Sequence, residues 1–263
     1  MFYSESFTFD GKQSEQIQVI STTGDILNEI GLKYSRSVSR DEGSTINPTY
    51  TTQEDEPDEI TIEFVHIDPN TNRLLKWDET TINEVKRWFI TDYFAPFMSA
   101  DNPGMIYYLK CTGITKKLTN KFTGILEVTF KPLTHYVYKQ SSVYISSTNR
   151  GSITTSNVNN PSHLPYRPIL KITKNDAQNY PITINEMEIR NVPNGTVLYI
   201  DNEMMICNDD KGRDYFASLF YYGVNEDVAR DSVNWIELQP GNNEIRVTGI
   251  CTIEVLAEFP ILL

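Results

Sequence analysis

Histidine and cysteine, the side chains that most often act as bases, nucleophiles or metal ligands, are few and scattered in this sequence. The chain has three of each: His66, His135, His163, Cys111, Cys207 and Cys251. No pair of histidines has the His-Glu-x-x-His spacing of a zinc site. The sequence also has no Gly-x-Ser-x-Gly elbow, no Gly-x-x-x-x-Gly-Lys phosphate loop and no Gly-x-Gly-x-x-Gly motif. We therefore predict a protein that is not an enzyme, with no catalytic residue, no metal and no cofactor.

The acidic stretch at Asp209 and Asp210, with Asp214 close behind, raises the question of a calcium site. An EF-hand loop needs oxygen ligands at alternate positions, a central glycine and a final glutamate. A loop that starts at Cys207 or Asn208 does not give that pattern, so the stretch is predicted to be a hairpin turn. Paired carboxylates for glycoside hydrolysis remain open, although nothing in the sequence selects two of the 35 acidic residues.

The charge balance argues against stable binding of nucleic acid. The net charge is -12, and the excess of acid is spread over both halves of the chain. Sequence-independent binding needs enough Lys and Arg to displace counterions from phosphates. The one basic cluster, Lys116, Lys117 and Lys121, has hairpin spacing and is predicted to be a solvated turn.

The sequence gives no sign of export or of membrane insertion. The N-terminus lacks the basic and apolar regions of a signal peptide, and no stretch approaches the roughly 20 apolar residues that span a bilayer. The odd number of cysteines and their strand-like neighbours predict buried thiols in a reducing compartment. We expect a chain that is made and folded in a cytoplasm and has no membrane partner.

Apolar alternation predicts a mainly β protein with one helix. Strands are expected at 7–9, 17–20, 60–64, 106–111 and 124–130, with an Asp-Gly turn after the first. Thr81 and Glu84 have capping-box spacing, which predicts a helix start. Ile82, Val85, Trp88 and Phe89 then share one face.

Residues 36–58 differ from the segments around them. Apolar residues are scarce, and an acidic run ends at Pro57, which predicts a solvated loop. A passive connector of that length is unusual, so the alternative is an arm that reaches a neighbouring subunit. The residues of that predicted arm are Arg36, Arg40, Tyr50, Glu54, Asp55 and Glu56.

Short strands separated by turn residues predict a β-sandwich in the second half of the chain. Strands are expected at 169–172, 182–184, 197–201, 244–248 and 252–259, and Pro193-Asn194-Gly195 is typical of a turn. We predict a domain boundary near residue 137, which gives domains 1–137 and 138–263.

The order of these features resembles the distal tail proteins (Dit) of tailed bacteriophages. The segments that carry the resemblance are Phe7–Ser14, Ile60–Phe64, the Trp88 helix, Tyr107–Cys111, Gly124–Phe130, Leu198–Asp201 and Trp235–Ile245 with its Leu-x-Pro-Gly-x-Asn turn. They span nearly the whole chain; each is weak alone, and the ordered set is moderately specific. The sequence departs from the family at Phe89, where an aliphatic residue is expected, and in the acidic loop 41–59.

This resemblance implies a tail-tube-like β-sandwich with one packed helix (1–137), followed by a galectin-like β-sandwich (138–263). It implies a structural ring, commonly a hexamer, at the tail tip or baseplate of the virion. The implied partners are copies of the chain itself, the tail tube protein, the tail-tip hub or tail-associated lysin protein, and a receptor-binding protein. Genomic DNA would pass through the lumen without specific binding. Assembly would take place in the host cytoplasm.

Two other functions remain open at this point. A carbohydrate-binding module that contacts the host cell wall would use aromatic residues such as Tyr221, Tyr222 and Trp235. The same three residues are also typical of core and interface packing. A hydrolase on a β-sandwich is the third hypothesis.

Overall fold

The protein consists of two compact units. The computed structural model describes residues 6–22, 36–40, 50–54, 56–119, 123–178, 180–221 and 233–262, with 19–22, 36–40 and 50–54 described by their backbone alone. The first unit is Met1–Tyr138 with Ile261–Leu263, and the second is Lys139–Pro260. The sequence had placed a boundary near residue 137.

The first unit is built on antiparallel strands. Within the described residues its strands are β1 (Phe7–Phe9), β2 (Lys12–Gln13), β3 (Ile17–Thr22), β4 (Arg36–Arg40), β5 (Tyr50–Glu54), β6 (Ile60–Asp68), β7 (Arg73–Leu74), β8 (Ala95–Ser99), β9 (Met105–Thr119) and β10 (Thr123–Pro132). Its main sheet runs β1-β8-β9-β10-β6-β3, with each neighbouring pair antiparallel. The turn after β1 has positive φ at Asp10 and Gly11 (52° and 72°), as expected for an Asp-Gly hairpin turn.

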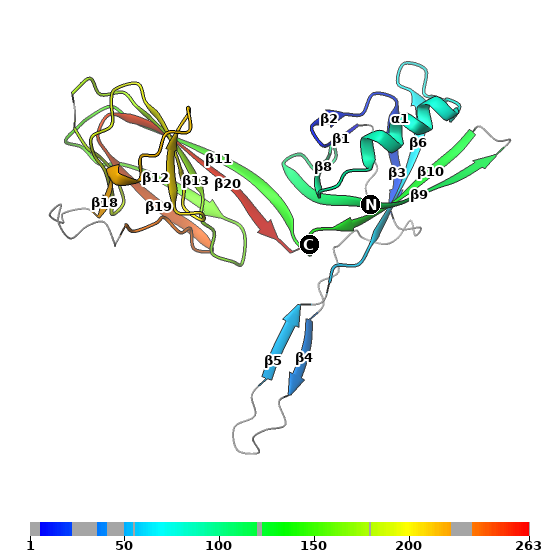
Figure 1. Ribbon diagram of the computed structural model, residues 1–263, viewed down its shortest axis with the longest axis horizontal. Helices are drawn as coiled ribbons and strands as arrows, with labels where there is room; N and C mark the ends of the chain where they lie inside the picture. Colours follow the sequence, from blue (N-terminus) through cyan, green and yellow to red (C-terminus); the bar gives the residue numbers. More distant parts are fainter. Residues whose placement is uncertain are drawn as a thin grey trace. The chain divides into compact units, whose positions relative to one another are not determined.

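One helix, α1 (Glu79–Phe89), covers this sheet (Figure 1). The predicted apolar face is confirmed for Ile82, Val85 and Phe89, which are all buried in the core of the unit. Trp88 is half-buried at the edge of that core, and its indole N–H donates to the carbonyl oxygen of Phe9 at 2.9 Å. The helix therefore ties β1 to the sheet by packing and by a hydrogen bond.

The helix does not begin where the capping-box pattern predicted. Its N-cap is Asp78, whose carboxylate accepts from the backbone N–H of Thr81 at 2.7 Å. That hydrogen bond lowers the pKa of Asp78. Asp is as good an N-cap as Thr, and Asp78 lies three residues earlier. The prediction of a cap at Thr81 was therefore wrong by one turn.

The predicted solvated turn at Lys116, Lys117 and Lys121 is also not what the structure shows for its first two residues. Lys116 and Lys117 both lie within β9. The Lys117 Nζ lies 2.5 Å from a carboxylate oxygen of Glu127 on β10 and 3.7 Å from one of Glu63 on β6. Opposite charges on adjacent strands favour continued pairing, which explains why the strand runs on. Lys121 lies outside the described residues.

The second unit is a sandwich of two antiparallel sheets. Within the described residues its elements are β11 (Val137–Ser147), β12 (Thr154–Asn160), β13 (Ile169–Lys174), β14 (Ile182–Ile184), β15 (Met187–Ile189), β16 (Val197–Asp201), β17 (Ile206–Asp209), a 3₁₀ turn η1 (Phe216–Ser218), β18 (Leu219–Tyr221), β19 (Gly241–Thr248) and β20 (Cys251–Ile261). One sheet has the order β17-β16-β13-β20-β11, and the other β12-β19-β14-β15-β18.

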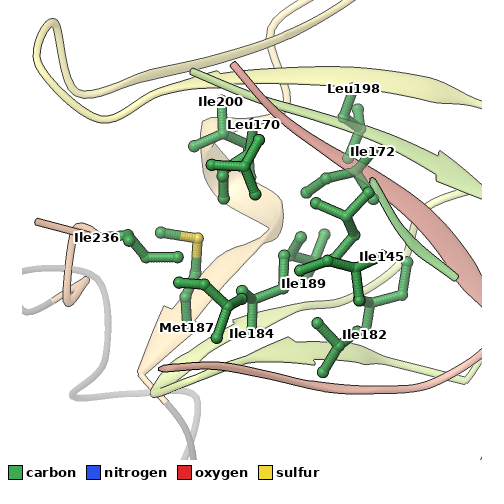
Figure 2. Packing of buried hydrophobic residues seen from close by; sticks show 14 of the residues in the cluster. Ile145, Leu170, Ile172, Ile182, Ile184, Met187, Ile189, Leu198, Ile200 and Ile236 are labelled. Carbon is green, nitrogen blue, oxygen red and sulfur yellow. The ribbon is translucent and has the colours of Figure 1, made fainter. Parts of the chain in front are cut away.

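The core of the sandwich comes from alternate residues of both sheets. Leu170 and Ile172 of β13 face Ile184 of β14 and Met187 of β15, and Figure 2 shows these aliphatic side chains packed against each other between the sheets. The alternation that predicted strands in this half is thus the alternation that fills the core. The predicted strand at 197–201 coincides with β16.

Candidate functional site

The predicted inter-subunit arm is a β-hairpin. Strands β4 and β5 pair antiparallel, with Arg36 opposite Glu54 and Arg40 opposite Tyr50. Among the described strands, these two pair with each other and with no other strand. The prediction of a plain solvated loop over 36–58 was therefore wrong for these two segments.

The acidic residues after the hairpin have different outcomes. Asp55 lies outside the described residues. Glu56 is exposed, and its carboxylate lies 2.5 Å from the Nζ of Lys131 on β10. The hydrogen bond and the charge of Lys131 lower the pKa of Glu56. An exposed pair of this kind contributes little to stability, but it places the chain after β5 beside β10.

The three residues of the predicted aromatic contact surface also differ from one another in their surroundings. Trp235 is half-buried against the core of the sandwich, and its ring stacks on Phe216 with the centroids 6.1 Å apart. Tyr221 is partly exposed, and its hydroxyl lies 3.3 Å from a carboxylate oxygen of Glu186. The charge of Glu186 and this hydrogen bond raise the pKa of Tyr221. Tyr222 lies outside the described residues. The packing interpretation therefore fits Trp235, and Tyr221 is the residue that remains for contact.

Beside Tyr221 lies an open polar hollow of about 410 Å³ that the sequence did not predict. Its lining residues are Asn185, Glu186, Asn234, Glu244 and Arg246. Glu186 receives hydrogen bonds from both Tyr221 and the Asn234 amide, the latter at 2.6 Å. The Arg246 guanidinium pairs with Glu244. The hollow is thus a set of polar planar groups that hold each other in place.

One signal in the sequence pointed to part of this hollow. Asn185 follows a strand predicted at 182–184, and asparagine is typical of turn positions with positive φ. It has a φ of 52° in the turn between β14 and β15. The convergence with Asn234 and Arg246, which lie 49 and 61 positions later, depends on sheet pairing that no local pattern encodes.

His66 and two of the three cysteines occupy buried positions. His66 is buried, with its ring nitrogens 2.9 Å from the carbonyl oxygen of Lys76 and 3.2 Å from the side-chain oxygen of Gln16. Cys207 and Cys251 are free, buried thiols, and burial raises the pKa of each to about 12. Such thiols are poor nucleophiles because almost none is ionised near neutral pH.

The acidic stretch at Asp209 and Asp210 forms a turn that is closed by an ion pair. The Asp209 carboxylate lies 2.6 Å from the Arg213 guanidinium and also accepts from the backbone N–H of Lys211 at 2.9 Å. In the part of the chain that the structure describes, no group of three or more His, Cys, Asp or Glu is arranged to hold a metal ion. Over the same residues, no helix is both long enough and apolar enough to cross a membrane.

Comparison with known proteins places the first unit in a family. Residues 2–132 match the model of the phage tail protein N-terminal domain. The N-terminal half of this chain belongs to that family. No curated protein sequence matches the chain significantly.

Solved structures extend the likeness of this phage tail protein over both units. The crystal structure of the Dit protein (gp 19.1) of phage SPP1, described as a paradigm of the hub adsorption apparatus in Gram-positive-infecting phages, matches with a TM-score of 0.60 at 15% identity. The match covers 97% of this chain and 98% of that one. The baseplate of phage p2, in its activated conformation with Sr, matches at 7% identity over 95% and 97% of the two chains, with a TM-score of 0.48.

These findings confirm the predicted resemblance at the level of family and fold. The chain is a mainly β phage tail protein, and hence a virion component, with a fold like that of the SPP1 Dit protein. The tail-tube-like and galectin-like natures of the two units remain predictions.

Proposed function

We propose that this phage tail protein is the distal tail subunit, which forms a hexameric ring between the tail tube and the tail-tip hub. One observation carries the proposal: the fold shared with the SPP1 Dit protein runs through 97% of the chain and includes both units. A fold likeness restricted to the phage tail domain at residues 2–132 would have left the second unit unexplained.

The β4–β5 hairpin supports ring formation. A ring is a heterologous interface that closes by rotation, so each subunit needs a donor surface and a different acceptor surface. A two-stranded ribbon is marginally stable on its own, and its unpaired edges are ready to pair with another chain. We propose that the hairpin, with Arg36, Arg40, Tyr50, Glu54, Asp55 and Glu56, is the arm that contacts the neighbouring subunit.

The chemistry of the chain fits a passive structural role. His66, Cys207 and Cys251 are buried, and the net charge is -12. An acidic ring would repel DNA phosphates, so the genome would slide through without adhering. In this proposal the N-terminal unit forms the ring at the tail tip, and the second unit braces or holds the receptor-binding protein. Assembly in the host cytoplasm would precede its incorporation into the virion.

Light scattering coupled to size exclusion tests the ring. Six copies of the 30.2 kDa chain would give a particle of about 180 kDa, and negative-stain images should show six-fold rings. A chain that stays monomeric at tens of micromolar contradicts the proposal. Turnover of host wall polymers would contradict the structural role and favour the hydrolase hypothesis.

Replacing residues 36–54 with a short Gly-Ser linker tests the arm. We expect the shortened chain to keep both of its unfolding transitions but to elute as a monomer. The matched control replaces residues 203–205, the exposed turn between β16 and β17 of the other unit, with Gly-Ser-Gly and should leave the hexamer intact. A shortened chain that still forms hexamers would refute the role of the hairpin.

A further inference from the structure

The polar hollow beside Tyr221 is formed by segments that sheet pairing brings together. β14 pairs both with β15 and with β19, so the turn at Asn185 and Glu186 lies next to Arg246. Two hydrogen bonds fix this arrangement: Asn185 N–H donates to the carbonyl oxygen of Arg246, and Arg246 N–H donates to the Asn185 side-chain oxygen, each at 2.8 Å. The wall of the hollow is therefore rigid at this point.

The remaining groups of the hollow are also held by their neighbours. Glu186 accepts from the Asn234 amide at 2.6 Å and from the Tyr221 hydroxyl at 3.3 Å, while Glu244 pairs with the Arg246 Nε. These contacts orient the carboxylates, the amide and the guanidinium around the hollow.

Each of these groups keeps hydrogen-bonding capacity that the described residues do not use. The Asn185 amide NH₂, the Asn234 carbonyl oxygen and the second Glu186 oxygen have no partner among the described residues, and the terminal nitrogens of Arg246 also remain available. One open hollow thus presents both donors and acceptors. A ligand that fits must itself carry both donors and acceptors, closely spaced.

Charge and polarity favour one ligand class over the others. The described lining residues carry two carboxylates and one guanidinium, a formal charge of -1, which disfavours phosphate and other anions. Among the described residues, the lining has no aliphatic anchor of the kind on which protein interfaces depend. Vicinal hydroxyl groups on a sugar ring donate and accept together, and they match planar amide, carboxylate and guanidinium groups. The volume of about 410 Å³ lies within the roughly 300–1,000 Å³ typical of ligand sites.

We infer that the hollow lined by Asn185, Glu186, Asn234, Glu244 and Arg246 binds a neutral saccharide, with Tyr221 at its rim. The site lies wholly within the second unit, so it does not depend on the proposed ring. Binding by one open hollow is weak, and several copies in one particle would strengthen it through avidity.

The test is binding of the full-length chain to an array of neutral bacterial oligosaccharides, with a phosphate-bearing teichoic acid fragment included as the anionic comparison. The best array ligand is then titrated by calorimetry. We expect at least one neutral oligosaccharide to bind. Arg246→Ala and Asn234→Ala should each weaken binding at least fivefold, because each removes ligand hydrogen bonds.

Arg167→Ala is the matched control, since Arg167 is another arginine paired with a glutamate, Glu237, at 3.2 Å. Arg167 lies outside the hollow, so the Arg167→Ala variant should bind the oligosaccharide as tightly as the wild type does. Unfolding curves check that all three variants are folded. The inference is overturned if no neutral oligosaccharide binds, if only the teichoic acid fragment binds, or if the two hollow variants bind as well as Arg167→Ala. Light scattering of the same samples tests the ring separately.

Discussion

The two units of this phage tail protein fill their hydrophobic cores with different types of side chain. The core of the N-terminal unit is aromatic, with Phe7, Phe9, Phe64, Trp77, Phe89, Phe97 and Phe130 all fully buried. The core of the second unit is aliphatic, and Phe259 is its one fully buried ring among the described residues. The difference follows from what covers each sheet.

In the N-terminal unit, the short helix α1 contributes only three buried side chains to the core. The largest of the three, Phe89, contacts five other rings with centroids 5.0–6.2 Å apart. In the sandwich, two sheets each present every second residue, so many medium-sized side chains share the space (Figure 2). In the first core most packing contacts involve a few large rings, whereas in the second they are shared among many aliphatic side chains.

The largest expected effect is therefore at the centre of the aromatic core. Phe89→Ala should destabilise the N-terminal unit by about 3–5 kcal/mol, through lost burial and the cavity left behind. In a Trp235→Phe background, tryptophan fluorescence during urea unfolding reports only on Trp77 and Trp88 of this unit.

The matched control for this change is Tyr93→Ala in the same unit, where the ring is 55% exposed. That control should cost about 1 kcal/mol or less. Equal losses in the two variants would show that the core is not concentrated on Phe89.

A smaller effect is expected in the aliphatic core. Ile184 is fully buried in the sandwich, and Ile184→Val should cost about 0.5–1.5 kcal/mol, because many neighbours surround the missing methyl group. Trp235 fluorescence, in a background with Trp77→Phe and Trp88→Phe, follows the urea unfolding of the second unit. A loss above about 3 kcal/mol would mean that the core of the sandwich is as concentrated as that of the first unit.

The smallest effect is expected in a comparison of the reactivity of the three thiols, which requires no substitution. Burial raises the pKa of Cys207 and Cys251 in the sandwich to about 12, whereas Cys111 of the first unit is half-buried and has a less raised pKa. At pH 8 a disulfide reagent should modify one thiol per native chain and three after unfolding in urea. Fast modification of all three in the native chain would contradict the burial of the sandwich thiols.

The thiols also give a pH dependence. A thiol pKa raised in the folded state stabilises the fold below the unfolded pKa of roughly 8.5. That stabilisation is lost as the pH rises toward the folded value of about 12. Alkaline titration should therefore weaken the sandwich unit first, as followed by Trp235 fluorescence.

Much of the fold could be predicted locally. Alternating residues gave strands such as β16, the Asp10-Gly11 pair gave its turn, and the spacing of Ile82, Val85 and Phe89 gave the buried face of α1. Each of these rests on the geometry of one element. The errors came where two local solutions compete, as at the N-cap, where Asp78 and Thr81 are equally suitable residue types.

The candidate site could be predicted only in part. Tyr221 was identified from its residue type, but its partner Glu186 lies 35 positions earlier and was not identified. Strands β4 and β5 were predicted to be a loop because apolar residues are scarce in their sequences, and strand prediction relies on apolar alternation.

The sequence by itself determined the mainly β architecture, the packed helix and the resemblance to phage distal tail proteins, because periodicity and turn residues act over a few positions. Tertiary structure alone decided that Lys117 stays in a strand between two glutamates, and that Asn185, Asn234 and Arg246 surround one hollow. Those outcomes depend on which strands pair and in what register, and pairing is set by burial of the whole core rather than by any one segment.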